Sequence, residues 1–162
     1  MKVGRIVVGL DLRERRNARL HALAKLAEQM QAELIGLFVE DIELLHLAAL
    51  PFALEVGFPS AARRELDVER LTRSFEAHAN ELRRACDAVF GSTTVSWSFR
   101  VARGARAEQL LSAAIEADAP TLLIPPGTDP RAEATVVSRS DLTEESLRAL
   151  LESTPRPILI LP

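Results

Sequence analysis

The chain of 162 residues is poor in cysteine and in aromatic residues. It has one cysteine, Cys86, no tyrosine, one tryptophan and six phenylalanines. A single cysteine excludes a disulfide framework within the chain and a metal cluster built from cysteines. The net charge is −3, so there is no basic face with interleaved aromatic residues of the kind that binds nucleic acid. We therefore expect no metal cofactor and no nucleic-acid partner.

Long hydrophobic runs are also missing. No stretch approaches the roughly 20 apolar residues of a membrane-spanning helix. The opening segment RIVVGLD, residues 5–11, is too short for the apolar core of a signal peptide, and no cleavage-site pattern follows it. Hydrophobic residues nevertheless make up 48% of the chain, too many for a disordered protein. The sequence predicts a cytoplasmic protein with one folded domain over residues 1–162 and no membrane partner.

Short apolar runs alternate with amphipathic segments along the chain. Four runs are typical of strands buried on both faces, at residues 5–10, 34–39, 121–124 and 157–162. A fifth segment, residues 93–101, alternates between apolar and polar side chains, as a half-exposed edge strand does. The intervening segments, 12–33, 61–90, 105–116 and 142–151, have helical spacing, and Asp141 or Thr143 can cap the last one. This alternation predicts an α/β fold with a doubly wound, five-stranded parallel sheet and helices on both faces.

The last strand has an apolar sequence although it ends the chain, and we expect it at an edge of the sheet. An apolar edge strand promotes association unless something covers it. A second copy of the chain is the simplest cover. The sequence therefore predicts a homodimer through Pro157, Ile158, Leu159, Ile160 and Leu161.

Residues 40–60 interrupt the alternation. The segment is apolar but irregular, and Pro51 ends its one short stretch of helical spacing. Charged and polar residues such as Glu43 and His46 argue against a membrane anchor. We interpret the segment as an insertion that folds over the sheet or into a subunit interface.

The longest predicted helix, residues 61–90, carries two residues that could attract a functional interpretation. Cys86 lies on the apolar stripe and is best read as a small core residue. His78 lies beside the stripe, where a boundary position is the simpler interpretation than a ligand.

Asp11 is the first polar residue after the first strand. In an open α/β sheet, ligands bind beyond the carboxyl ends of the central strands. Asp11 is therefore either part of such a site or a carboxylate that caps a helix or turn, and the residues around it leave both interpretations open.

Three segments resemble the universal stress protein family. They are RIVVGLD, residues 5–11; AELIGLFV, residues 32–39; and VARGARAEQLLSAAIEADAPTLLIPPG, residues 101–127. In the third segment Gly104, Ala107 and Glu108 match the family's strand–x–x–Gly–x–x–Ala–Glu pattern, and the closing RPILILP resembles its terminal strand. The resemblance implies an adenine nucleotide alpha hydrolase-like fold with strand order 3-2-1-4-5. It also implies dimerisation through the last strand.

The resemblance fails at the phosphate loop. Many members of that family bind ATP through Gly-x2-Gly-x9-Gly-Ser/Thr after the fourth strand, where glycines let backbone N–H groups approach the phosphates. Here Gly127 is followed by Asp129 and Pro130 at the place of the second glycine, and no glycine occurs from residue 128 onward. Residues 127–146 therefore form a degenerate phosphate-loop region, and the chain is identified as a divergent member that lacks the ATP-binding glycine motif.

The other half of the nucleotide site is better preserved. The resemblance places Asp11 and Val39 at positions that contact the base and ribose, although Leu12 replaces a small residue. Together with Gly127 these residues form a vestigial nucleotide site. The resemblance thus implies that ATP is not bound in the family's usual way, while AMP or an adenosine-like ligand remains an alternative.

We expect a non-enzymatic, dimeric protein that acts as a stress-response interaction or regulatory module. The alternative is a sensor that binds an AMP- or adenosine-like molecule in the cleft at the strand ends. A nucleotide hydrolase is the least supported hypothesis, because the sequence shows no Ser–His–Asp order, no metal-ligand spacing and no phosphate loop.

Overall fold

A computed structural model describes the chain except for residues 1, 12–17, 42–53, 57–62, 66–67 and 154–155. The main sheet consists of β1 (Arg5–Leu10), β2 (Glu33–Asp41), β5 (Trp97–Gly104), β6 (Thr121–Ile124), β7 (Thr135–Ser138) and β8 (Ile158–Leu161). The helices are α1 (Ala18–Met30), α3 (Val68–Phe90), α4 (Arg106–Ile115) and α5 (Glu144–Ser153), with a 3-10 turn at Arg139–Asp141. A separate two-stranded antiparallel sheet pairs β3 (Leu54–Val56) with β4 (Arg63–Glu65).

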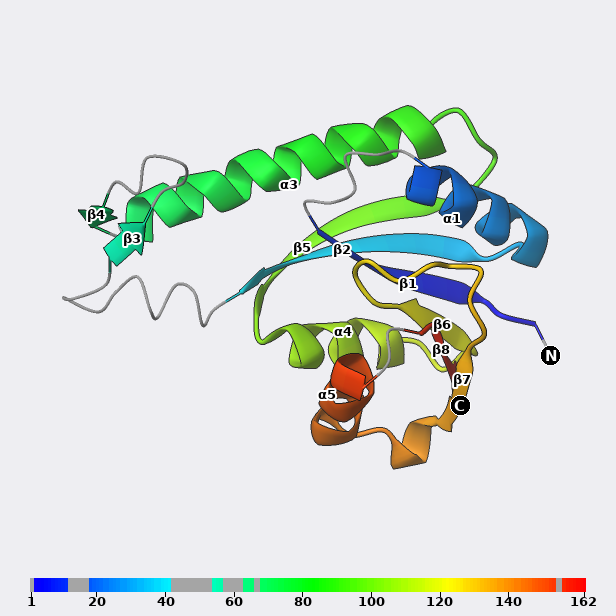
Figure 1. Cartoon of the computed structure of the whole chain (residues 1–162). Coiled ribbons are helices and arrows are strands. Elements are labelled where there is room, and N and C mark those ends of the chain that lie inside the picture. The colour runs from blue at the N-terminus through cyan, green and yellow to red at the C-terminus, as the bar shows by residue number, and fades with distance from the viewer. Residues whose placement is uncertain (1, 12–17, 42–53, 57–62, 66–67, 154–155) are drawn as a thin grey trace.

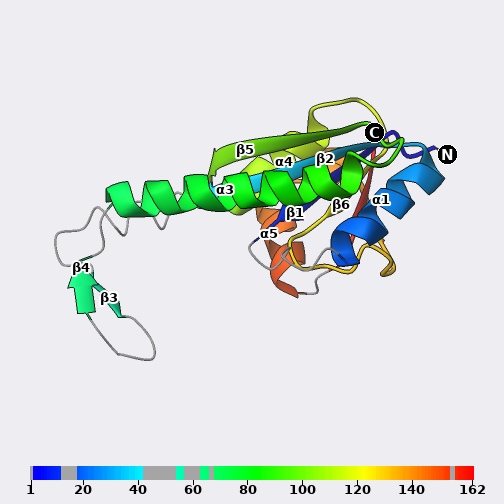
Figure 2. The same ribbon diagram turned by 90° about the horizontal axis from the view of Figure 1, so that it is seen from above.

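The helices cover both faces of the main sheet. Figure 1 shows α1 and α3 on one face and α4 and α5 on the other. Each face has its own hydrophobic cluster, with Leu23 and Leu82 in the first and Leu110 and Leu147 in the second. The α3 helix extends beyond the sheet, and β3 and β4 lie past its first turns (Figure 2). The expected α/β fold with helices on both faces is therefore confirmed.

The strand order is β5-β2-β1-β6-β8-β7. Strand β1 lies at the centre and pairs in parallel with β2 and with β6, and β5 pairs in parallel with β2. Strand β8 is antiparallel to β6 and parallel to β7. The predicted sheet, five strands all parallel in the order 3-2-1-4-5, is wrong in its strand count, in its full order and in the direction of the last strand.

The expectation that the last strand is an edge is also wrong. Strand β8 lies between β6 and β7, so both of its backbone edges are paired. Ile158 and Ile160 are each 2% exposed. The apolar composition of this strand thus reflects burial within one chain, and Pro157–Leu161 do not present a free strand edge to a second copy.

The missing strand is β7, residues Thr135–Ser138, which lies within residues 127–146, the segment interpreted as a degenerate phosphate-loop region. Its four residues TVVS favour a strand, but the polar residues on both sides hide so short a signal. Strand β7 takes the edge position that was predicted for β8.

The helix predictions are correct in place but not in all boundaries. The α3 helix begins at Val68, because Arg63–Glu65 belongs to β4 rather than to the helix. Cys86 is 1% exposed, which confirms its place in the core. Thr143 caps α5, since its Oγ1 accepts the Ser146 N–H at 3.1 Å while Ser146 Oγ accepts the Thr143 N–H at 2.8 Å.

Much of the predicted insertion at residues 40–60 lies outside the described residues, and so does its predicted helical stretch. Within the part of the chain that is described, no helix is both long and apolar enough to cross a membrane.

Candidate functional site

A pocket of about 300 Å³ opens at the carboxyl ends of β1 and β2. Strand β1 is central, and the strands that follow it in the chain lie on both sides of it. Doubly wound sheets usually bind their ligands beyond the carboxyl end of such a strand. The lining residues are Gly9, Leu10, Asp11, Leu37, Phe38, Val39, Asp41, Phe75, His78, Arg106, Leu110 and Pro126. They come from β1, β2, α3, α4 and the segment after β6, so both helical layers contribute to the pocket.

Apolar side chains form most of the pocket wall. Phe38 of β2 and Phe75 of α3 meet edge to face, with 6.4 Å between the ring centroids and 71° between the ring planes. Leu10 and Leu110 are 4% and 0% exposed and close the pocket toward the interior. Aromatic and aliphatic walls of this kind suit a flat, uncharged group.

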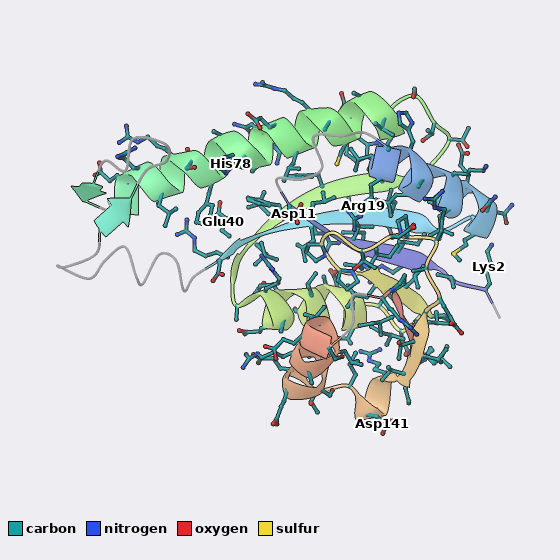
Figure 3. The ribbon with its side chains drawn as sticks, in the orientation of Figure 1. Lys2, Asp11, Arg19, Glu40, His78 and Asp141 are labelled. Atoms are coloured by element: carbon teal, nitrogen blue, oxygen red, sulfur yellow. The ribbon has the colours of Figure 1, made fainter. Side chains whose placement is uncertain are left out.

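Four polar side chains also line the pocket: Asp11 directly after β1, Asp41 of β2, His78 of α3 and Arg106 of α4. Figure 3 shows His78 on the side of α3 that faces the sheet, above the end of β1 where Asp11 lies. Arg106 is the first residue of α4, whose N-cap residue, Ala105, makes no side-chain cap. The lining of the pocket thus combines two carboxylates, one guanidinium and one imidazole with its apolar wall.

Glu40 lies between two residues that line the pocket but is not among the lining residues. Its carboxylate is paired with Arg103 of β5, with Nε 3.1 Å from Oε2. Glu40 and Arg103 are also direct partners in the β2–β5 register. This ion pair ties the ends of the two strands together beside the pocket.

A tight turn follows β6 where the phosphate loop was expected. The Thr128 N–H donates to Pro125 O at 3.2 Å, and Gly127 has φ 74°, a value that favours glycine. Arg19 of α1 holds the turn from outside: its Nε donates to Thr128 O at 2.8 Å and its NH2 group to Pro125 O at 2.9 Å. Two carbonyl groups of this turn, those of Pro125 and Thr128, therefore accept hydrogen bonds from the Arg19 guanidinium.

Pro126, inside this turn, packs directly on the central strand. A Cβ added at Gly9 would lie 2.5 Å from Pro126 Cδ. Only a glycine at position 9 allows the proline ring to come so close. Gly9 and Pro126 together form one wall of the pocket.

The residues after the turn do not form a phosphate cradle. Thr128 is 1% exposed, and its Oγ1 has no hydrogen-bond partner among the described residues. Hydrogen bonds from the Arg131 N–H and side chain to Asp129 lower the pKa of that carboxyl group, so a negative charge stands beside the turn. The chain then enters β7 instead of a glycine-rich loop.

The predicted site residues can now be placed. Asp11 and Val39 both line the pocket. Gly127 forms the turn next to Pro126 but is not a lining residue, and Leu12 lies outside the described residues. Sequence reasoning missed Asp41, Phe75, His78 and Arg106, and it interpreted His78 as a residue at the boundary of the apolar stripe rather than as a ligand.

A signal for one missed residue was present in the sequence. Asp41 follows the apolar run of β2 much as Asp11 follows that of β1, and parallel strands bring such residues to the same edge. No comparable signal marks Phe75 and His78, because their place depends on how α3 crosses the sheet. Among the residues that the structure describes, no group of three His, Cys, Asp or Glu side chains could hold a metal ion.

Comparison with known proteins finds similarity in structure only. No protein-family profile matches the sequence, and no curated protein matches it either. Among solved structures, the universal stress protein UspA from Lactobacillus plantarum aligns over 100% of this chain and 99% of its own, with 14% identity and a TM-score of 0.54.

Two further structures agree with this result. A protein of the universal stress protein family from Burkholderia pseudomallei has 19% identity and a TM-score of 0.52, with 97% of this chain and 95% of its own covered. The hypothetical protein MJ0577 has 11% identity and a TM-score of 0.53, with 99% and 96% covered. The chain therefore has the fold of the universal stress proteins along essentially its whole length.

Proposed function

We propose that this chain is a divergent, non-enzymatic member of the universal stress protein family that regulates by binding a small, uncharged ligand of nucleoside size. The observation that carries the proposal is the pocket at the ends of β1 and β2, which joins an apolar wall to Asp11, Asp41 and His78. Its volume, about 300 Å³, matches the lower end of the range for small-molecule sites.

The chemistry of the pocket favours a ligand without a triphosphate. The lining holds the carboxylates of Asp11 and Asp41 against one guanidinium, that of Arg106, and Asp129 beside the turn after β6 is ion-paired with Arg131. Arg19, which could otherwise attract phosphate, donates to two carbonyl groups of that turn. A flat molecule with amino or hydroxyl donors for the carboxylates fits better, and adenosine is a suitable probe of that class.

Within this proposal the lining residues bind the ligand and do not catalyse a reaction. Among the described residues that line the pocket there is no serine, threonine, cysteine or lysine that could act as a nucleophile. The polar groups that do line it are suited to hydrogen bonding and orientation.

The proposal is tested by measuring the melting temperature with adenosine, AMP and ATP plus Mg²⁺. A ligand that binds the folded state raises the melting temperature, and we expect the rise to be largest with adenosine and to shrink with each added phosphate. The variant Asp11→Asn should reduce the rise with adenosine. Asp87→Asn, an exposed change on α3 away from the lining residues, is the matched control and should leave it unchanged.

Two outcomes would count against the proposal. A larger rise with ATP and Mg²⁺ than with adenosine would show a working phosphate site. Turnover of any of these nucleotides that Asp11→Asn abolishes would show that the protein is an enzyme.

A further inference from the structure

A second cavity, of about 380 Å³, adjoins the ligand pocket at the carboxyl edge of the sheet. It lies between the start of α4 and the last turns of α5, two helices that pack together on one face of the sheet (Figure 1). Asp41 of β2 and Arg106 of α4 line both the pocket and the second cavity. Because the two spaces share these residues, a ligand in the pocket needs only a short chain of atoms to reach the second cavity.

The second cavity is charged where the pocket is mainly apolar. Its lining contains two guanidinium groups and two carboxylates, those of Arg106, Arg148, Asp41 and Glu152. The positive and negative charges of these four side chains balance. A phosphate would meet both carboxylates here, and a simple cation would meet both guanidinium groups, whereas a group with one charge of each sign can satisfy both kinds of side chain.

The side chains of opposite charge in the second cavity are held apart from each other. Among the described residues, Arg106 and Glu152 form no ion pair, either with each other or with another side chain. Arg148 donates from NH2 to Glu144 Oε1 at 2.8 Å, but a guanidinium has five N–H donors, so further donors remain for a ligand. The second cavity can thus receive a carboxylate at its arginines and an ammonium group at Glu152.

We propose that the second cavity binds the zwitterionic amino-acid group of a ligand whose nucleoside part occupies the pocket. The α-carboxylate accepts hydrogen bonds from Arg106 and Arg148, and the α-ammonium group donates to Glu152. This inference rests on the proposed function and names the class of ligand: nucleosides with an α-amino acid attached to the sugar through a short chain. Such a group has no net charge, in keeping with a site that disfavours phosphate.

The test compares two probes by titration calorimetry, S-adenosylhomocysteine and methylthioadenosine. Both are thioethers of the same nucleoside, and only the first carries the amino-acid group. We expect the dissociation constant of S-adenosylhomocysteine to be about 10-fold lower, which corresponds to about 1.4 kcal/mol. Arg106, Arg148 and Glu152 are exposed to solvent, so the difference should narrow as the salt concentration rises.

Two variants on α5 remove one charge each from the second cavity. Arg148→Gln and Glu152→Gln change exposed side chains that line the second cavity but not the pocket. Each should reduce the ratio of the two dissociation constants to about threefold or less, because exposed ion pairs contribute up to about 1 kcal/mol. Glu145→Gln, an exposed change on the same helix outside both linings, is the matched control and should keep the ratio of the wild type.

The outcomes separate this inference from the proposed function. If the wild type binds both probes equally well, the amino-acid subsite is wrong while the nucleoside site stands. If neither probe nor adenosine binds, the proposed function is wrong and the subsite with it. If the preference for S-adenosylhomocysteine persists unchanged in both glutamine variants, the amino-acid group binds elsewhere and the assignment to the second cavity is wrong.

Discussion

The contact between Gly9 and Pro126 can be tested by adding one methyl group. In Gly9→Ala the new Cβ would lie 2.5 Å from Pro126 Cδ, 2.7 Å from Cγ and 3.0 Å from its backbone nitrogen. These are ring and backbone atoms in a turn that Arg19 holds with two hydrogen bonds, so they cannot move aside freely.

Overpacking of this kind costs about 1–3 kcal/mol of unfolding free energy. For a chain of this length each kilocalorie lowers the melting temperature by about 2–4 °C, so we expect a decrease of roughly 2–12 °C. Calorimetry or urea denaturation measures the effect. Gly4→Ala is the matched control, because its Cβ would lie 3.5 Å from Ala119 Cβ, an ordinary van der Waals distance, and stability should hardly change.

A double variant separates this contact from a general effect of alanine in β1. Replacing Pro126 with alanine removes the ring that the new methyl group meets, so Gly9→Ala should be less destabilising in a Pro126→Ala background than in the wild type. Equal stability of Gly9→Ala and the wild type would refute the reasoning. It would mean that the turn after β6 does not rest on β1.

Three further predictions concern the supports of the fold. Arg19→Ala should lower the unfolding free energy by about 1–3 kcal/mol, because two carbonyl acceptors lose a charged donor. The control is Arg73→Ala, because Arg73 Nε donates to Glu69 O within α3 at 3.4 Å, and urea denaturation should show a much smaller effect for it. Thr143→Ala should cost about 1 kcal/mol through loss of the α5 cap, and an unchanged urea midpoint would show that the cap contributes nothing. Arg100, followed by Arg5, lowers the pKa of Glu116 below its ordinary 4.5. The charged carboxylate therefore stabilises the folded protein fully above pH 4.5, and this stabilisation is lost as the pH falls through the lowered pKa. Acid denaturation of Glu116→Gln should lack this part of the pH dependence.

Sequence patterns were most reliable where burial alone decides the structure. The apolar runs of β1 and β6 stand at residues 5–10 and 121–124 as predicted, because a strand covered by helices on both faces needs apolar residues throughout. The same rule indicates a strand at β8, whose residues are ILIL, but it could not place that strand inside the sheet. Side-chain composition reports which faces of a strand are covered and not which backbone edges are paired.

The direction of β8 and the existence of β7 could not be obtained in this way. Apolar composition is the same for a parallel and an antiparallel buried strand. The four residues of β7 become a strand because β8 offers them a partner, which is a tertiary effect that local propensity does not contain.

The candidate site was predictable in part for a similar reason. Asp11 and Val39 lie at the ends of neighbouring parallel strands, and the order of those strands brings them together. His78, Phe75 and Arg106 enter the pocket from helices, and their contribution depends on helix position and rotation over the sheet. Strand residues of such a site follow from sequence more readily than helix residues do.

The central claim is that the pocket retains the part of the site that binds a nucleoside-sized molecule and lacks the part that binds phosphates. Titration calorimetry of the wild-type protein with adenosine, and separately with ATP and Mg²⁺, tests this claim most directly. The account predicts measurable binding of adenosine and weaker binding of ATP. Tighter binding of ATP than of adenosine would contradict it.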